Sequence, residues 1–256
     1  MAAPLKIDLN CDLGESYGRY SLGEDEAMMA MITSANIACG FHAGDPDVMA
    51  HTVVLAKEQH VAIGAHPGYP DLQGFGRRRL EMAHQEIIHA LIYQLGALQA
   101  FTQLAGLSLV HVKPHGALYN LAAQDINTAE AVAEAVVKFD PALILVGLAG
   151  SALIRAGKAF GLHTANEGFP DRAYLADGSL SPRSQPGAVI TDPAAVAENA
   201  LKLVQDGIKT NGKQILIDTL CLHGDNPQAV NNAQTLRKAL TSEGVVIAPL
   251  KEVLLS

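Results

Sequence analysis

The stretch NIACGFHAGD at 36–45 limits the fold most strongly, because an apolar run ends there abruptly in polar residues. The apolar residues at 37–39 can pack as a buried strand, and glycines near His42 permit the tight turn that follows. Asp45 then precedes Pro46, and an N-cap acceptor before a proline at the first helical position predicts a helix start. The stretch therefore predicts a strand, a polar loop and a helix, in that order.

The same order of strand, polar loop and helix recurs along the chain. Apolar runs bounded by turn residues predict further strands at 6–13, 61–65, 107–112, 142–146, 162–166 and 215–222, and a short one near 245–248. Helices are predicted over 84–104, over 21–32, and from Asp192 to about Lys209. Strand and helix thus alternate about seven times, which predicts an α/β fold: a distorted (β/α) TIM-like barrel rather than a doubly wound sheet.

Composition limits the class of protein. The chain has 256 residues, of which 49% are hydrophobic, so residues 1–256 are predicted to form a single barrel domain. A net charge of −8 without a basic face argues against a nucleic-acid partner. The most apolar run, at 143–154, is too short to span a bilayer. Three isolated cysteines and the absence of a signal-peptide pattern at the start predict a cytoplasmic protein.

Acidic and basic side chains gather at the predicted strand ends. These pairs are Asp12 and Glu15, His42 and Asp45, His66 and Asp71, Lys113 and His115, and His223 and Asp225. Period-two alternation over 6–13 places Asp8 and Asn10 on the same polar face as Asp12, and Glu167 and Arg172 follow the strand predicted at 162–166. Because the carboxyl ends of barrel strands open on one mouth, these residues are predicted to meet in one polar cleft.

The residue types in this cleft suggest acid–base chemistry. Histidine and aspartate side chains suit proton transfer to and from a water or a leaving nitrogen, and Lys113 could stabilise a developing oxyanion. Asp12, His42 and His66 could instead ligate one divalent metal, although no single element carries a metal-ligand spacing. Cys39 lies inside an apolar run, so packing explains it better than a role as a nucleophile.

Three other segments allow more than one interpretation. GIKTNGKQ at 207–214 nearly matches a phosphate-binding loop, but Gln214 replaces the required hydroxyl and the segment leaves a helix instead of a strand, which predicts an ordinary turn. The glycines at 147–151 fit either a turn or an anion site at a helix start. The Ser-, Pro- and Gly-rich segment 174–186 is predicted to be a mobile excursion or lid. The three arginines at 77–79 fit a solvated loop, from which one of the three could reach an anionic substrate or partner.

At these residues the sequence resembles the LamB/YcsF family, the A subunits of the prokaryotic ATP-dependent 5-oxoprolinase. The matching motifs cover nearly the whole chain: IDLNCDLGES at 7–16, SANIACGFHAGDP at 34–46, AIGAHPGYPDLQGFGRR at 62–78, VKPHGALYN at 112–120, NEGFPDRAY at 166–174 and CLHGDNP at 221–227. The resemblance implies a barrel akin to those of glycoside hydrolases and polysaccharide deacetylases. It also implies cleavage of 5-oxo-L-proline to L-glutamate coupled to ATP hydrolysis, together with partner subunits B and C.

Site residues can then be assigned for this reaction. The expected catalytic residues are Asp12, His42, Asp45, His66, Lys113 and His115, and the expected substrate-binding residues are Asp8, Asn10, Glu15, Glu167, Arg172 and His223. Arg172 or Lys113 is expected to pair with the substrate carboxylate. Since the chain lacks a credible nucleotide motif, ATP is expected to bind chiefly to the partner subunits or across their interface, and this chain is expected to open the ring. The alternatives are a stand-alone metal-dependent amidase or deacetylase and a non-catalytic ligand-binding subunit.

Overall fold

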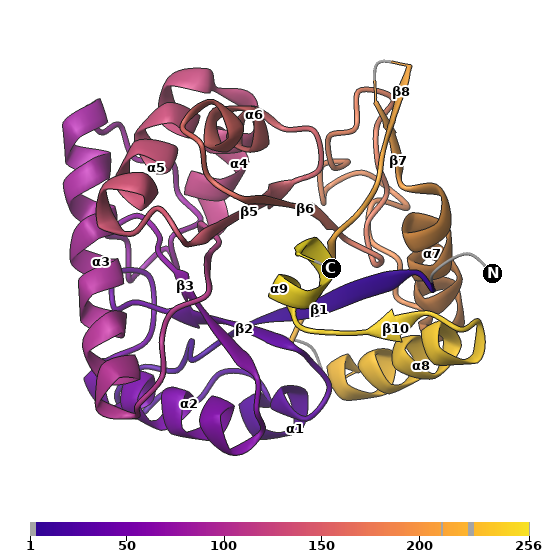
Figure 1. The fold of residues 1–256 in the computed structure, drawn as a ribbon, viewed down its shortest axis with the longest axis horizontal. Coiled ribbons are helices and arrows are strands. Elements are labelled where there is room, and N and C mark those ends of the chain that lie inside the picture. Colours follow the sequence, from indigo (N-terminus) through magenta and orange to yellow (C-terminus); the bar gives the residue numbers. More distant parts are fainter. Residues whose placement is uncertain (1–3, 211, 225–227, 256) are drawn as a thin grey trace.

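Strand β1 (Lys6–Leu13) is the hub of the sheet in the computed structural model, which describes residues 4–210, 212–224 and 228–255. It pairs in parallel with β2 (Ser34–Ala38), with β9 (Thr219–Leu222) and, at its start, with β10 (Val246–Ile247). The β1–β9 pairing closes the order β1-β2-β3-β4-β5-β6-β9 into a parallel barrel of seven strands (Figure 1). The predicted barrel is therefore confirmed.

The remaining barrel strands are β3 (Ala62–His66), β4 (His111–Val112), β5 (Ile144–Leu148) and β6 (Thr164–Gly168). Their order agrees with the prediction, but β4 is confined to the last two residues of the run predicted at 107–112. The predicted strand 215–222 was too long at its start. Ile215 ends β8 (Lys213–Ile215), which pairs antiparallel with β7 (Ile208–Thr210). Five residues of the phosphate-loop look-alike, 208–210 and 213–214, therefore lie in these two strands.

Helices surround the barrel (Figure 1). They are α1 (Asp25–Met29), α2 (Pro46–Glu58), α3 (His84–Leu104), α4 (Gly116–Gln124), α5 (Ile126–Phe139), α6 (Ala152–Ala159), α7 (Pro193–Asp206), α8 (Ala229–Ser242) and α9 (Leu250–Leu254). The predicted bounds of α3 are confirmed, whereas α1 is shorter than the predicted 21–32 and the sequence did not reveal α4 and α5. Among the helices in the described ranges, none has the length and apolarity needed to cross a bilayer.

The main core lies between the barrel and its helices. On β1, Ile7, Leu9, Cys11 and Leu13 pack into this core, so the intervening polar residues face the barrel interior, as the period-two pattern predicted. Leu250 of α9 packs against Ile144, Val146 and Ala165, close to the starts of β5 and β6. Helix α9 therefore covers the amino-terminal end of the barrel, and the opposite end remains as the mouth.

Gly64 of β3 makes room for a histidine inside the barrel. A Cβ at this position would lie 2.1 Å from Nε2 of His111, which is 2.7 Å from Oδ1 of Asn36. We expect Gly64→Ala to lower the free energy of unfolding by about 2–4 kcal/mol, since it overpacks the interior and breaks this buried hydrogen bond. Urea unfolding measures the change.

Gly96 of α3 supplies the matched control, because nothing lies within 4 Å of a Cβ there. Gly96→Ala should stabilise the protein by up to about 1 kcal/mol through helix propensity. If Gly64→Ala were as stable as Gly96→Ala, the histidine would not be held against the glycine.

Candidate active site at the barrel mouth

A polar cleft of about 270 Å³ opens at the carboxyl ends of the strands. Its walls come from the ends of β1 and β3 and from the segments that follow β3, β4, β6 and β9. They include Asp12, His66, Arg77, Lys113, His115, Tyr119, Phe169, Arg172, Arg183 and His223. Six of the twelve expected site residues line this cleft: Asp12, His66, Lys113, His115, Arg172 and His223. This volume suits a small ligand better than a nucleotide.

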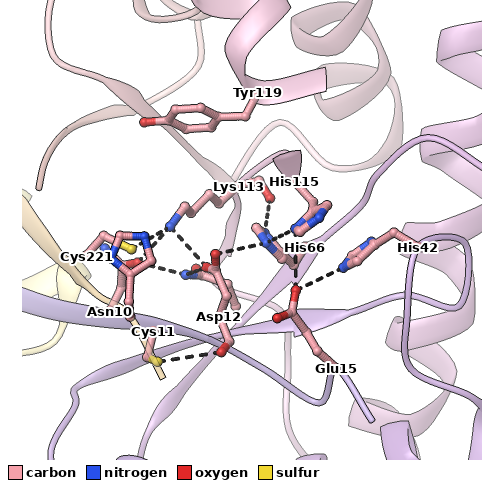
Figure 2. Close-up of polar contacts among 12 residues, drawn as sticks. Asn10, Cys11, Asp12, Glu15, His42, His66, Lys113, His115, Tyr119 and Cys221 are labelled. Carbon is pink, nitrogen blue, oxygen red and sulfur yellow. Dashed lines mark hydrogen bonds and ion pairs between the residues drawn. The ribbon is translucent and has the colours of Figure 1, made fainter. Parts of the chain in front are cut away.

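Lys113 lies buried at the base of this cleft, surrounded by acceptors (Figure 2). Its Nζ lies 2.7 Å from Oε1 of Glu167, 3.0 Å from Oδ1 of Asp12, 3.1 Å from Oδ1 of Asn10 and 3.1 Å from Sγ of Cys221. Burial acts to lower the pKa of Lys113, but Asp12 and its other neighbours outweigh this effect and raise the pKa well above its usual value. Lys113 is therefore an ammonium ion whose three hydrogens all have acceptors within the protein.

Asp12 connects Lys113 to the histidines. Oδ1 of Asp12 accepts hydrogen bonds from Lys113 and from Nδ2 of Asn36, while Oδ2 lies 3.2 Å from Nε2 of His66. Burial acts to raise the pKa of Asp12, but His66 and Lys113 together hold it well below its usual range. With 27% of its side chain exposed, Asp12 presents an ionised carboxylate to the cleft.

Two backbone carbonyls fix the proton positions on His66 and His115. Nδ1 of His66 lies 2.7 Å from the carbonyl oxygen of Lys113, and Nε2 of His115 lies 2.8 Å from that of Phe75. A carbonyl only accepts, so both of these nitrogens carry hydrogen. The other nitrogens, Nε2 of His66 and Nδ1 of His115, lie 2.9 Å apart.

His42 and Glu15 complete this group. The His42 ring is buried and stacks on His115 with centroids 3.7 Å apart, and its Nε2 lies 3.2 Å from Oε1 of Glu15. The same carboxylate oxygen is 3.4 Å from Nδ1 of His115 (Figure 2). Burial lowers the pKa of His42 well below its usual value and that of His115 to about 3, with further lowering by neighbouring histidines, so both rings are neutral at neutral pH.

Glu15, His42, His66 and His115 each offer one ligand atom, and these atoms all lie within 4.8 Å of one another. Such a group can hold a metal ion. The sequence suggested a different set, Asp12, His42 and His66. The structure instead adds Glu15 and His115 to the two histidines and leaves Asp12 beside the group.

Asp45 and Asp8 lie outside the cleft, and their hydrogen bonds serve the fold. Asp45 is the N-cap of α2. Its oxygens accept hydrogen bonds from the backbone N–H groups of Asp47, Val48 and Gly18, which gives this carboxylate a structural role. Asp8 lies deep in the barrel, where it accepts hydrogen bonds from the hydroxyls of three residues: Thr33, Ser34 and Thr219. Burial raises the pKa of Asp8 to about 6.

The remaining candidates line the cleft or lie near it. Arg172 lines its edge while donating to the carbonyl oxygens of Ser181 and Ala188, so it also holds the excursion predicted at 174–186.

Of the three arginines at 77–79, Arg77 lines the cleft, and Arg78 pairs with Asp71. Asn10 lies beneath the cleft as an acceptor for Lys113. Asp225 lies outside the described residues.

Several residues of the site were not singled out by the sequence analysis. Tyr119 donates to Oε2 of Glu167 at 2.6 Å, and it lies within the VKPHGALYN motif, which was the available signal. Asp171 lies 2.7 Å from Nδ1 of His223, so a second histidine–carboxylate pair stands at the cleft. A neighbouring hollow of about 660 Å³ shares Arg172 and Arg183 with the cleft.

His111, beneath the cleft, gives the folded protein a pH dependence. Burial, and then Lys113, lower its pKa to about 3, against about 6.5 in an unfolded chain. Below pH 6.5 this histidine binds a proton in the unfolded chain but not in the folded chain. The free energy of unfolding therefore decreases as the pH falls from about 6.5 toward 3. This loss is about 1.4 kcal/mol per pH unit. We expect His111→Gln to flatten the pH dependence of the free energy of unfolding by this slope, as measured by urea unfolding between pH 6 and pH 4.5. Equal slopes for the two proteins would contradict the assignment.

Comparisons with known proteins give matches over nearly the whole chain. A sequence model of the LamB/YcsF family matches residues 7–255. The chain is 55% identical over 250 residues to the 5-oxoprolinase A subunit of Syntrophobacter fumaroxidans, covering 96% of this chain and 99% of that protein. It is 52% identical over 250 residues to the 5-oxoprolinase A subunit of Pyrococcus furiosus, covering 96% and 98%. The crystal structure of the lactam utilization protein from Thermus thermophilus is similar with a TM-score of 0.89 and 46% identity, covering 95% of this chain and 99% of that one.

Proposed function

Because the chain belongs to the LamB/YcsF family, we propose that it is the A subunit of an ATP-dependent 5-oxoprolinase, which converts 5-oxo-L-proline to L-glutamate. The relatives named as 5-oxoprolinase A subunits support a hydrolase that acts on a cyclic amide. The observation that carries the proposal is the small cleft in which the ionised Asp12 faces His66 above a buried ammonium group. Subunits B and C would be its partners.

The low reactivity of the lactam explains why this reaction needs ATP. A five-membered lactam is a nearly unstrained amide whose carbonyl is poorly electrophilic, and phosphorylation of its oxygen makes the carbon easier to attack. The nearest sequence match to a phosphate loop in the described residues, at 207–214, follows helix α7 and runs into the β7–β8 pair, whereas a phosphate loop leaves a strand and opens a helix. We therefore assign ATP binding chiefly to the partner subunits or to the interface with them.

The cleft supplies proton acceptors and donors for ring opening. As water attacks the activated carbonyl carbon, Asp12 accepts a proton from it. The bond from that carbon to the ring nitrogen then breaks, and the nitrogen gains a proton, for which His223 beside Asp171 is the candidate donor. The acyl phosphate left on the side chain is hydrolysed by a second water to glutamate and inorganic phosphate. The pairing of Lys113 with Asp12 and Glu167 favours a role in positioning Asp12 over direct contact with the oxyanion.

The substrate carboxylate is assigned to Arg172. Its guanidinium group has five N–H donors. Nε and Nη2 each donate one hydrogen bond to a backbone carbonyl, and the other donors remain for an anion at the edge of the cleft. Lys113, the other expected partner, has all of its hydrogens engaged.

A metal-dependent amidase that works without ATP is the second candidate, favoured by the group of Glu15, His42, His66 and His115. An assay of glutamate formation from 5-oxoproline separates the two. We expect glutamate only when ATP and both partner subunits accompany this chain. Glutamate from the chain alone, with a metal and without ATP, would favour the amidase. Unchanged activity of the complex after His42→Ala would favour a non-catalytic, ligand-binding subunit.

A further inference from the structure

Two imidazole nitrogens face each other at the cleft. Nε2 of His66 and Nδ1 of His115 lie 2.9 Å apart, while the other nitrogen of each ring donates to a backbone carbonyl, that of Lys113 or of Phe75. The two carbonyls therefore turn both rings so that their remaining nitrogens point to one place. A metal ion there could accept a lone pair from each ring.

Carboxylate oxygens converge on the same point. Oε1 of Glu15 lies 3.4 Å from Nδ1 of His115, and Oδ2 of Asp12 lies 3.2 Å from Nε2 of His66 (Figure 2). A proton would join only two of these acceptors, whereas a metal ion joins all of those in its coordination shell. Negative charge also lies beside this point, since Asp12 and Glu167 both pair with the ammonium group of Lys113.

We infer that Glu15, His66 and His115 bind one divalent transition-metal ion through Oε1, Nε2 and Nδ1. Nδ1 of His115 lies 2.9 Å from Nε2 of His66 and 3.4 Å from Oε1 of Glu15, close to the distances of about 3.0–3.4 Å between adjacent ligands whose metal bonds are about 2.0–2.1 Å long. All three atoms lie within 4.8 Å of one another. Histidine ligands of metals usually donate their second ring N–H to a backbone carbonyl, as both rings do here. Imidazole and carboxylate donors suit zinc and its first-row neighbours.

His42 holds two of the ligands in place. No carbonyl fixes its tautomer, so its Nε2 can carry hydrogen and donate to Oε1 of Glu15, and its ring stacks flat on His115. Three protein ligands leave a coordination position open, and His66 and His115 both line the cleft. Three protein ligands is the number found in catalytic zinc sites, and the carboxylate of Asp12 lies 3.2 Å from one of them, Nε2 of His66. A bound ion there would lower the pKa of a coordinated water.

Titration of the purified full chain with Zn²⁺, after treatment with a chelator, tests the inference without any assay of 5-oxoproline. Isothermal calorimetry should report one Zn²⁺ per chain. His66→Gln, His115→Gln and Glu15→Gln should each weaken binding by more than about 100-fold, which exceeds the effect typical of residues that only support a ligand. Zn²⁺ should also raise the thermal unfolding midpoint of the wild type and leave those of the variants unchanged.

His84→Gln is the matched control, because His84 and Glu134 form a histidine–glutamate pair on the surface. It should bind Zn²⁺ like the wild type. If a variant fails to fold, nitrogen NMR of the wild-type histidine rings gives the answer, since Zn²⁺ should shift Nε2 of His66 and Nδ1 of His115. Absence of binding at millimolar Zn²⁺, binding retained in both His66→Gln and His115→Gln, or binding lost in His84→Gln would overturn the inference.

Discussion

Replacing Asp12 by asparagine is expected to slow glutamate formation by the complete enzyme about 10²- to 10⁴-fold, the usual range for loss of a general base. The amide keeps the shape of the side chain but cannot accept the proton of the attacking water. The carboxylate is ready for this task, because Lys113 and His66 keep it ionised despite its burial. Initial rates of glutamate formation at saturating 5-oxoproline and ATP measure the effect.

Asp45→Asn is the matched control for this change. It makes the same chemical substitution on a strand-end aspartate that caps α2 and lies outside the cleft. Its rate should remain within a few-fold of the wild type, and the asparagine can still accept from the helix. Equal losses of rate in the two variants would contradict the assignment of Asp12, and not Asp45, as the general base.

Replacing Lys113 by methionine is expected to lower the free energy of unfolding by about 3–5 kcal/mol, the cost of removing one partner from a buried ion pair. Methionine fills most of the space, but it leaves Glu167, which is fully buried, and Asp12 without their cation. Urea unfolding at pH 7 measures the change. Adding Glu167→Gln should recover part of the loss, because it removes one of the uncompensated charges.

Lys202→Met removes an exposed lysine that pairs with Glu198 on the surface of α7. Its stability should not differ measurably from that of the wild type, since solvent screens such pairs. A Lys113→Met protein as stable as Lys202→Met would show that the buried network contributes nothing to the fold.

The barrel and its polar mouth could be predicted from local patterns. Alternation over β1 fixes which of its residues face inward, and the Asp45–Pro46 pair fixes the start of α2. The hairpin of β7 and β8 was missed because Ile215 continues into the apolar run of β9. Only strand pairing in three dimensions separates the two.

The roles of individual acids could not be predicted from the sequence. Asp8 and Asp12 lie on the same face of β1, but four residues of strand span about 13 Å, which separates the barrel interior from the mouth. Asp45 and Glu15 both follow strands near glycines. They differ in whether the oxygens meet the N–H groups of a helix or the rings of His42 and His115, which depends on the paths of two separate loops.

The central claim is that this chain opens the ring of an activated lactam while its partners supply the ATP step. The most direct measurement compares ATP hydrolysis and glutamate formation, both in the presence of 5-oxoproline, for a complex reconstituted with the Asp12→Asn chain. We expect glutamate formation to fall at least about 100-fold while ATP hydrolysis continues, so that the ATP consumed per glutamate rises. Loss of ATP hydrolysis, with hydrolysis of a pre-activated substrate left intact, would instead place this chain in the phosphorylation step.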